Sequence, residues 1–159
     1  MYRTHTCGEL KAADAGKPVT LSGWVHSRRD HGGVIFIDLR DRYGLTQVVF
    51  NPQDCPEPAK AAHGLKFEDV VQVEGKTRAR QAGAVNPNMP TGQIELAADR
   101  LVVLSRATPS PFEISDHVKV SEETRLTYRY LDLRRPQMQK NIAMRHKVTC
   151  QFGIAAASR

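Results

Sequence analysis

Apolar and polar residues alternate strictly over residues 34–40, VIFIDLR, which is the pattern of a half-buried β-strand. Ile35, Ile37 and Leu39 define one face, and we predict that this face lies in a hydrophobic core. Phe36 lies on the other face, beside charged residues. An aromatic side chain exposed among basic residues is a common means of holding single-stranded nucleic acid. The pattern also allows the simpler interpretation that Phe36 covers a neighbouring loop, because isolated exposed apolar side chains are normal.

Similar alternation predicts further strands, separated by segments rich in Gly, Pro, Asn and Asp. They are expected over residues 18–28, 45–51, 70–80 and 93–105, with a break in the last one near residues 97–99. A weak helical segment, AKAAHGL, occupies residues 59–65 between the third and fourth strands. Five strands with a short helix in this position describe a mainly β fold, the five-stranded OB-fold barrel.

OB-folds bind oligonucleotides on their second and third strands and on the loops beside them. Simple alternation directs an aromatic ring, an amide and several guanidinium groups outward on this part of the barrel. They belong to Arg28, Phe36, Arg40, Gln47, Arg78 and Arg80. This mixture favours a nucleic-acid-binding face, and the alternative is an outer surface whose charges are merely solvated.

Composition supports a polyanionic partner, because 23 Lys and Arg residues exceed 17 Asp and Glu residues and give a net charge of +6. Cys7, Cys55 and Cys150 are far apart, and the six histidines show no ligand spacing. We therefore expect no disulfide framework and no metal site, which fits a reducing cytoplasm. The sequence has no apolar run long enough to cross a membrane, and its N-terminus lacks the apolar core of a secretory signal.

After the predicted barrel, the sequence pattern changes from alternating strands to a linker followed by helices. We expect the barrel and its N-terminal lead-in over residues 1–106, a linker containing Pro and Ser over residues 107–120, and helices over residues 121–159. Ser121 can cap the first helix, and Pro136 suits the first turn of a second one. The second helix has an apolar side formed by Met138, Ile142, Val148 and Phe152. Too little chain remains for a second core, so this helix is expected to need a partner surface or the rest of a larger protein.

Two segments resemble a known family. Residues 23–52, GWVHSRRDHGGVIFIDLRDRYGLTQVVFNP, resemble the N-terminal anticodon-binding domain of bacterial aspartyl-tRNA synthetases. Residues 124–142, TRLTYRYLDLRRPQMQKNI, resemble the hinge and first helix that lead into their class II catalytic domain. GKTRAR and TGQIEL further along the barrel match in place, and the resemblance covers residues 3–149. It implies that the chain binds the anticodon stem-loop of tRNA-Asp, and of tRNA-Asn in some members.

The resemblance also implies roles for individual residues. Phe36 matches the aromatic on which the central anticodon base, a uridine, stacks, and Gln47 matches the amide that hydrogen-bonds to this base. Arg29 matches the arginine beside them, whereas strand alternation points to Arg28, and a bulge before the turn would reconcile the two. The residues that match fourth-strand and loop positions near the anticodon are Arg78, Arg80 and Asn86.

Two loop positions bear on which tRNA is charged. His31 and Gly83 resemble the relaxed type of the family, which also attaches aspartate to tRNA-Asn in organisms that make Asn-tRNA by amidation. This resemblance implies that the chain does not discriminate between the two tRNAs.

The ATP-binding motifs of class II synthetases, an FRDE-like segment and a Gly-rich segment ending in Arg, do not occur in the sequence. We therefore expect a chain truncated before the catalytic core, with no catalytic residue and no activity alone. ATP and Mg²⁺ belong to the full-length family, and no cofactor is expected in this chain. Because the family dimerises through its catalytic domain, we expect a monomer. The alternative function is a stand-alone OB-fold module that binds single-stranded nucleic acid.

Overall fold

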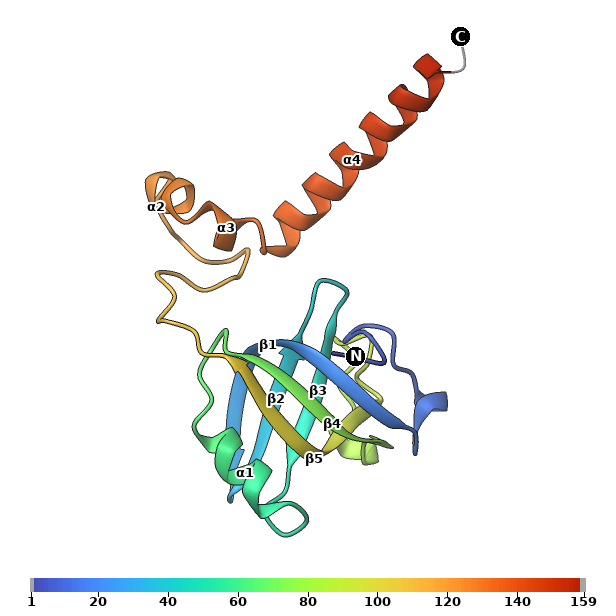
Figure 1. Ribbon diagram of the computed structural model, residues 1–159, viewed down its shortest axis with the longest axis vertical. Helices are drawn as coiled ribbons and strands as arrows, with labels where there is room; N and C mark the ends of the chain where they lie inside the picture. The colour runs from blue at the N-terminus through green and yellow to red at the C-terminus, as the bar shows by residue number, and fades with distance from the viewer. Residues whose placement is uncertain (1, 158–159) are drawn as a thin grey trace. The chain divides into compact units, whose positions relative to one another are not determined.

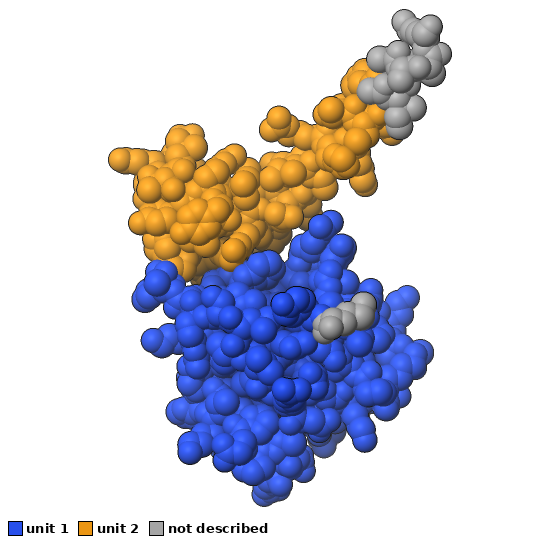
Figure 2. Space-filling view, in the orientation of Figure 1, with its two compact units in different colours: residues 1–109 blue, residues 110–159 orange. Residues whose placement is uncertain are grey.

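The computed structural model describes residues 2–157, without the side chains of residue 82 and residues 153–157. The chain divides into two compact units, Met1–Pro109 and Ser110–Arg159 (Figures 1 and 2). Among the described residues, no helix is both long enough and apolar enough to cross a membrane.

The first unit is a closed barrel with the strand order β1-β2-β3-β5-β4. Its elements are η1 (Ala12–Asp14), β1 (Pro18–His31), β2 (Val34–Arg40), β3 (Leu45–Phe50), α1 (Pro56–His63), β4 (Val70–Ala79), η2 (Ala82–Ala84) and β5 (Ile94–Ser105). Neighbouring strands are antiparallel except β3 and β5, which are parallel. Five strands, with a helix between the third and fourth, confirm the predicted OB-fold.

The barrel encloses the apolar face that alternation predicted. Ile35, Ile37 and Leu39 are all buried, and Phe50 is among the largest side chains that are completely enclosed. Helix α1 lies at one end of the barrel, where Ala59 and Ala62 join the same core (Figure 1). The helix begins earlier than predicted, at Pro56, because proline already has a helical φ angle and lacks the N–H that a first turn leaves unpaired.

A β-bulge in β1 changes which side chains face outward. Val25 pairs with Leu39 but Ser27 pairs with Asp38, so one extra residue lies between them on β1. Beyond the bulge, Arg29 is opposite Phe36, and Arg28 is opposite the core residue Ile37. Directly paired residues share a face of the sheet. The expectation that Arg28 faces outward is therefore wrong, and Arg29 occupies the position beside Phe36.

Strand β5 is continuous, so the break expected near residues 97–99 is also wrong. The change in pattern arises from a second irregularity, because Glu74 pairs with Arg100 while Gly75 pairs with Ala98. At Gly75 the two backbones approach so closely that a Cβ atom would lie 2.0 Å from the carbonyl oxygen of Ala97. Only glycine fits there without a shift of the backbone.

The second unit contains α2 (Glu122–Thr127), α3 (Arg129–Asp132) and α4 (Pro136–Ala157). Ser121 caps α2 as predicted, because its hydroxyl accepts a hydrogen bond from the Thr124 N–H at 3.2 Å. A small core of Phe112, Ile114 and Leu131 holds the unit together, so the expectation that too little chain remains for a second core is wrong. Along α4, the apolar side chains of Ile142, Met144, Val148 and Phe152 are exposed.

Replacing Phe50 by alanine should lower the free energy of unfolding by about 3–5 kcal/mol, because the ring is fully enclosed in the barrel. Urea unfolding followed by the fluorescence of Trp24, the single tryptophan, measures this loss. Phe67 is 65% exposed and provides the matched control, for which the change to alanine should cost about 0.5 kcal/mol or less. Equal losses for the two variants would contradict the described core.

Candidate nucleic-acid interface

Phe36 lies on the outer surface of the barrel, at the centre of three neighbouring strands. It is opposite Arg29 on β1 and Val49 on β3. The ring is half-buried, and the His31 ring contacts it edge-on, with 5.6 Å between the ring centres. This contact supports one side of the aromatic ring and fixes its orientation.

Asp38 holds Arg29 in place. The Nη2 atom of Arg29 donates to both carboxylate oxygens of Asp38, at 2.9 and 3.1 Å. The Ser27 hydroxyl donates to the same carboxylate. Because Asp38 is two residues beyond Phe36 on the same face of β2, it anchors the guanidinium group beside the ring. The Arg29 side chain is still 49% exposed, so part of the group is open to a ligand.

Gln47 connects this arrangement to the neighbouring strand β5. Its carbonyl oxygen lies 3.4 Å from Nη2 of Arg29, and its Nε2 donates to Glu95 at 3.1 Å. Glu95 also accepts a hydrogen bond from Nε of Arg78 at 2.7 Å. Side chains from all five strands thus form one polar chain. We call Ser27, Arg29, Phe36, Asp38, Gln47, Arg78 and Glu95 the outer-face cluster.

The outer-face cluster has the groups that recognition of a nucleotide requires. An aromatic ring can stack on a base, and an amide offers both a donor and an acceptor to a base edge. Two half-exposed guanidinium groups, Arg29 and Arg78, can bind phosphate or stack on a base. Asp38 and Glu95 were missed as site residues, because their roles depend on pairing between strands that alternation does not reveal.

Arg80 does not face outward, and the expectation from alternation is wrong here. Strand β4 ends at Ala79, and Arg80 as a whole residue is only 8% exposed. Its Nε donates to the carbonyl oxygen of Ile94 at 2.9 Å, and its Nη1 lies 3.4 Å from that of Ala84. Burial lowers the pKa of the guanidinium group, whereas the nearby charges of Glu95 and Asp38 raise it. Arg80 therefore links the end of β4 to β5 and η2 through these carbonyl groups.

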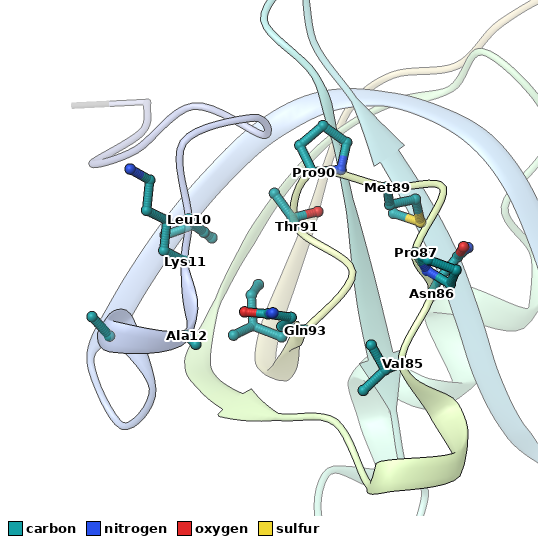
Figure 3. Close-up of a pocket in the computed structure, with 12 residues that line it drawn as sticks. Leu10, Lys11, Ala12, Val85, Asn86, Pro87, Met89, Pro90, Thr91 and Gln93 are labelled. Carbon is teal, nitrogen blue, oxygen red and sulfur yellow. The ribbon is translucent and has the colours of Figure 1, made fainter.

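Asn86 lies in the loop between β4 and β5, beside a cavity of about 530 Å³. Figure 3 shows Asn86 and Met89 on one side of this cavity, Lys11 on the other, and Gln93 between them. No hydrogen bond or ion pair among the described residues links Asn86 to the outer-face cluster.

The two positions expected to influence tRNA choice lie in different surroundings. His31 contacts Phe36, so it is part of the surroundings of the ring. Gly83 is exposed in η2, and no atom lies within 4 Å of the place where its Cβ would be. A side chain at this position would therefore project into open space.

The fold and the outer-face cluster define a nucleic-acid-binding barrel. Residues 19–104, more than half of the chain, match the family described as OB-fold nucleic acid binding domain. The chain belongs to this family.

Individual relatives make the similarity more specific and confirm the resemblance to aspartyl-tRNA synthetases. The chain is 54% identical over 150 residues to the aspartate–tRNA(Asp/Asn) ligase of Salinibacter ruber, covering 92% of this chain and 24% of that protein. It is 54% identical over 156 residues to the ligase of the same name from Desulfosudis oleivorans, covering 98% and 26%. The chain spans about a quarter of the length of these curated relatives.

A solved structure agrees with these sequence relationships. The asparaginyl-tRNA synthetase from Pyrococcus horikoshii superimposes with a TM-score of 0.70 at 31% identity, over 86% of this chain and 31% of that one. The shared architecture therefore extends beyond the residues of the barrel family.

Replacing Arg80 by alanine should lower the free energy of unfolding by about 1–3 kcal/mol, because buried carbonyl groups lose their donor. Replacing Arg78 should cost about 1 kcal/mol or less, since this side chain is 48% exposed and makes one ion pair. Urea unfolding of both variants tests the distinction. A larger loss for Arg78 than for Arg80 would contradict the structural role of Arg80.

Proposed function

We propose that this chain recognises the anticodon of tRNA-Asp, as the anticodon-binding part of an aspartate–tRNA ligase. The observation that carries the proposal is the outer-face cluster, in which Phe36, Gln47 and Arg29 meet on β1, β2 and β3 of a nucleic-acid-binding barrel. The aspartate–tRNA(Asp/Asn) ligases that share about half of its residues support the choice of RNA.

The central base of the anticodon stacks on Phe36, supported by His31 from the side. Gln47 hydrogen-bonds to the edge of this base. Its amide is oriented before RNA binds, because the NH₂ group points at the Glu95 carboxylate and the carbonyl oxygen points at Arg29. If the amide were reversed, its carbonyl oxygen would face the carboxylate of Glu95, and the two oxygen atoms would repel each other. Each of these contacts is sensitive to the position or identity of a base.

Arg29 and Arg78 supply positive charge on either side of the base. Each is bound to a carboxylate yet half exposed, so each can reach a phosphate without losing its anchor. Contacts of this kind position the RNA without reading its sequence. We propose recognition alone for these 159 residues, and in a full-length ligase we place ATP and Mg²⁺ outside them.

A general single-strand-binding module is the second candidate, and the outward-facing, half-buried ring of Phe36 and the basic net charge of the chain favour it. The two functions differ in selectivity. A generic module binds unrelated single strands with similar affinity and depends steeply on salt. An anticodon-binding domain prefers a GUC hairpin over a hairpin with a scrambled loop at the same salt concentration.

Replacing Phe36 by alanine should weaken binding of a GUC anticodon hairpin by about 1–3 kcal/mol, which is about 5–150-fold in Kd, because the stacking surface is lost. Fluorescence anisotropy with labelled hairpin measures the effect. Phe67→Ala removes an exposed ring in the loop before β4 and should bind like the wild-type chain. Wild-type affinity in Phe36→Ala, with the barrel still folded, would contradict the proposal.

We also propose that the chain accepts tRNA-Asn, in keeping with the name of its relatives, aspartate–tRNA(Asp/Asn) ligase, and with His31 and Gly83. GUC and GUU hairpins, which differ only in the third anticodon base, should then bind with affinities that differ by less than about a hundredfold, or about 2.8 kcal/mol. Competition between the two hairpins for the wild-type chain measures this ratio. A greater preference for GUC would show that the chain discriminates.

A further inference from the structure

The turn between β2 and β3 presents an aromatic ring between two positive charges. Tyr43 is 53% exposed. The guanidinium carbon of Arg42 lies 4.7 Å from the centre of its ring, and that of Arg3 lies 5.5 Å from it. Both distances are within the range of cation–π interactions. We call Arg3, Arg42 and Tyr43 the turn patch.

A buried carboxylate makes this turn rigid. The Oδ1 atom of Asp41 accepts hydrogen bonds from the N–H groups of Tyr43, at 2.7 Å, and Gly44, at 3.0 Å. Its Oδ2 atom accepts from the N–H of Cys7 at 3.0 Å and from Arg3 at 3.2 Å. The ring is thus fixed before any partner arrives, which reduces the entropy lost on binding.

Close backbone packing adds to this rigidity. Gly44 lies against Gly8 so tightly that a Cβ atom on Gly44 would be 2.5 Å from the Cα atom of Gly8. The N-terminal lead-in and the turn therefore form one unit. Arg3 is brought beside Tyr43 by this packing, although the two residues are far apart in the sequence.

Arg42 and Tyr43 of the turn patch lie in the turn that joins β2 and β3, two of the strands that carry the outer-face cluster. Phe36, Asp38 and Arg40 share one face of β2, and the pair Arg40–Leu45 immediately precedes the turn. From Phe36 to the start of the turn at Asp41, the chain extends about 17 Å at about 3.4 Å per residue. Along one strand of duplex DNA the phosphates are about 3.4 Å apart, so a strand of about five nucleotides covers a similar length. An RNA hairpin whose central loop base lies on Phe36 can therefore bring its stem to this distance.

Charge favours RNA as the occupant. The side chain of Arg3 is bound to Asp41, but Arg42 makes no ion pair with any described residue. The exposed guanidinium group of Arg42 can bind a phosphate of the RNA, and the exposed ring of Tyr43 offers a flat surface to a ribose. The chain as a whole is also basic, with a net charge of +6.

We propose that the turn patch is a second RNA contact, which binds the sugar–phosphate backbone of the stem adjoining the anticodon loop. Arg42 and Arg3 bind phosphates, and Tyr43 contacts ribose. The contact is independent of sequence and sets the direction in which the hairpin leaves the barrel. This inference rests on the proposed anticodon recognition and extends it beyond the loop.

Binding to two RNAs distinguishes the stem contact from the loop contacts. One RNA is a GUC hairpin with its full stem, and the other is the loop sequence alone as a single strand. Tyr43→Ala and Arg42→Ala should each weaken binding of the hairpin by about fivefold or more. Both should bind the single strand within about twofold of wild type. Arg42→Ala should also reduce the salt slope of hairpin binding by about 1. Tyr43→Phe keeps the ring and should retain most of the hairpin affinity.

The outcomes distinguish this inference from the proposed function. If Phe36→Ala weakens hairpin binding but Tyr43→Ala and Arg42→Ala do not, the second contact is disproved and anticodon recognition stands. Equal weakening for both RNAs would also disprove a stem contact. If the turn-patch variants change self-association but not RNA affinity, the patch is a protein contact. Unchanged hairpin affinity in Phe36→Ala would overturn the proposed function and this inference with it. Trp24 fluorescence in urea confirms that each variant is folded.

Discussion

One extra residue in β1, His26, lies between the pairs Val25–Leu39 and Ser27–Asp38, and the position of every outward side chain beyond it follows from this bulge. Without it, Arg28 would be directed outward and Arg29 toward the core. With it, Arg29 is opposite Phe36 and within reach of both Asp38 and Gln47. β-bulges commonly redirect side chains in this way beside binding sites. A backbone irregularity thus assembles the candidate site from otherwise regular strands.

The ion pairs of the outer-face cluster matter more for position than for stability. Arg29 and Arg78 are half exposed, and pairs of this kind typically contribute about 0–1 kcal/mol. Their geometric effect is greater, because each carboxylate fixes one guanidinium group and Glu95 also orients the amide of Gln47. Prior ordering of these groups lowers the cost of binding. The buried Asp41 has the same effect on the turn that carries Tyr43.

The sequence predicted the parts of the molecule that depend on local pattern. Alternation identified the core face of β2 and the outward position of Phe36, since one strand is sufficient to show both. It misplaced Arg28 because a bulge depends on pairing with a second strand. It also failed at Arg80, where the strand has already ended and the side chain turns back to the β5 backbone. The partnership of Gln47 with Glu95 joins residues that are far apart in sequence, so no local pattern predicts it. The resemblance to aspartyl-tRNA synthetases pointed to Arg29, which the strand pairing places opposite Phe36, whereas periodicity pointed to Arg28.

The central claim is that the outer surface of β1, β2 and β3 holds an anticodon. NMR spectra of the ¹⁵N-labelled chain, recorded during titration with unlabelled GUC hairpin, test it most directly. We predict that the side-chain NH₂ signals of Gln47 and the backbone amide signals of Arg29 and Phe36 shift first and most. Changes confined to α1, with these signals unmoved, would contradict the claim.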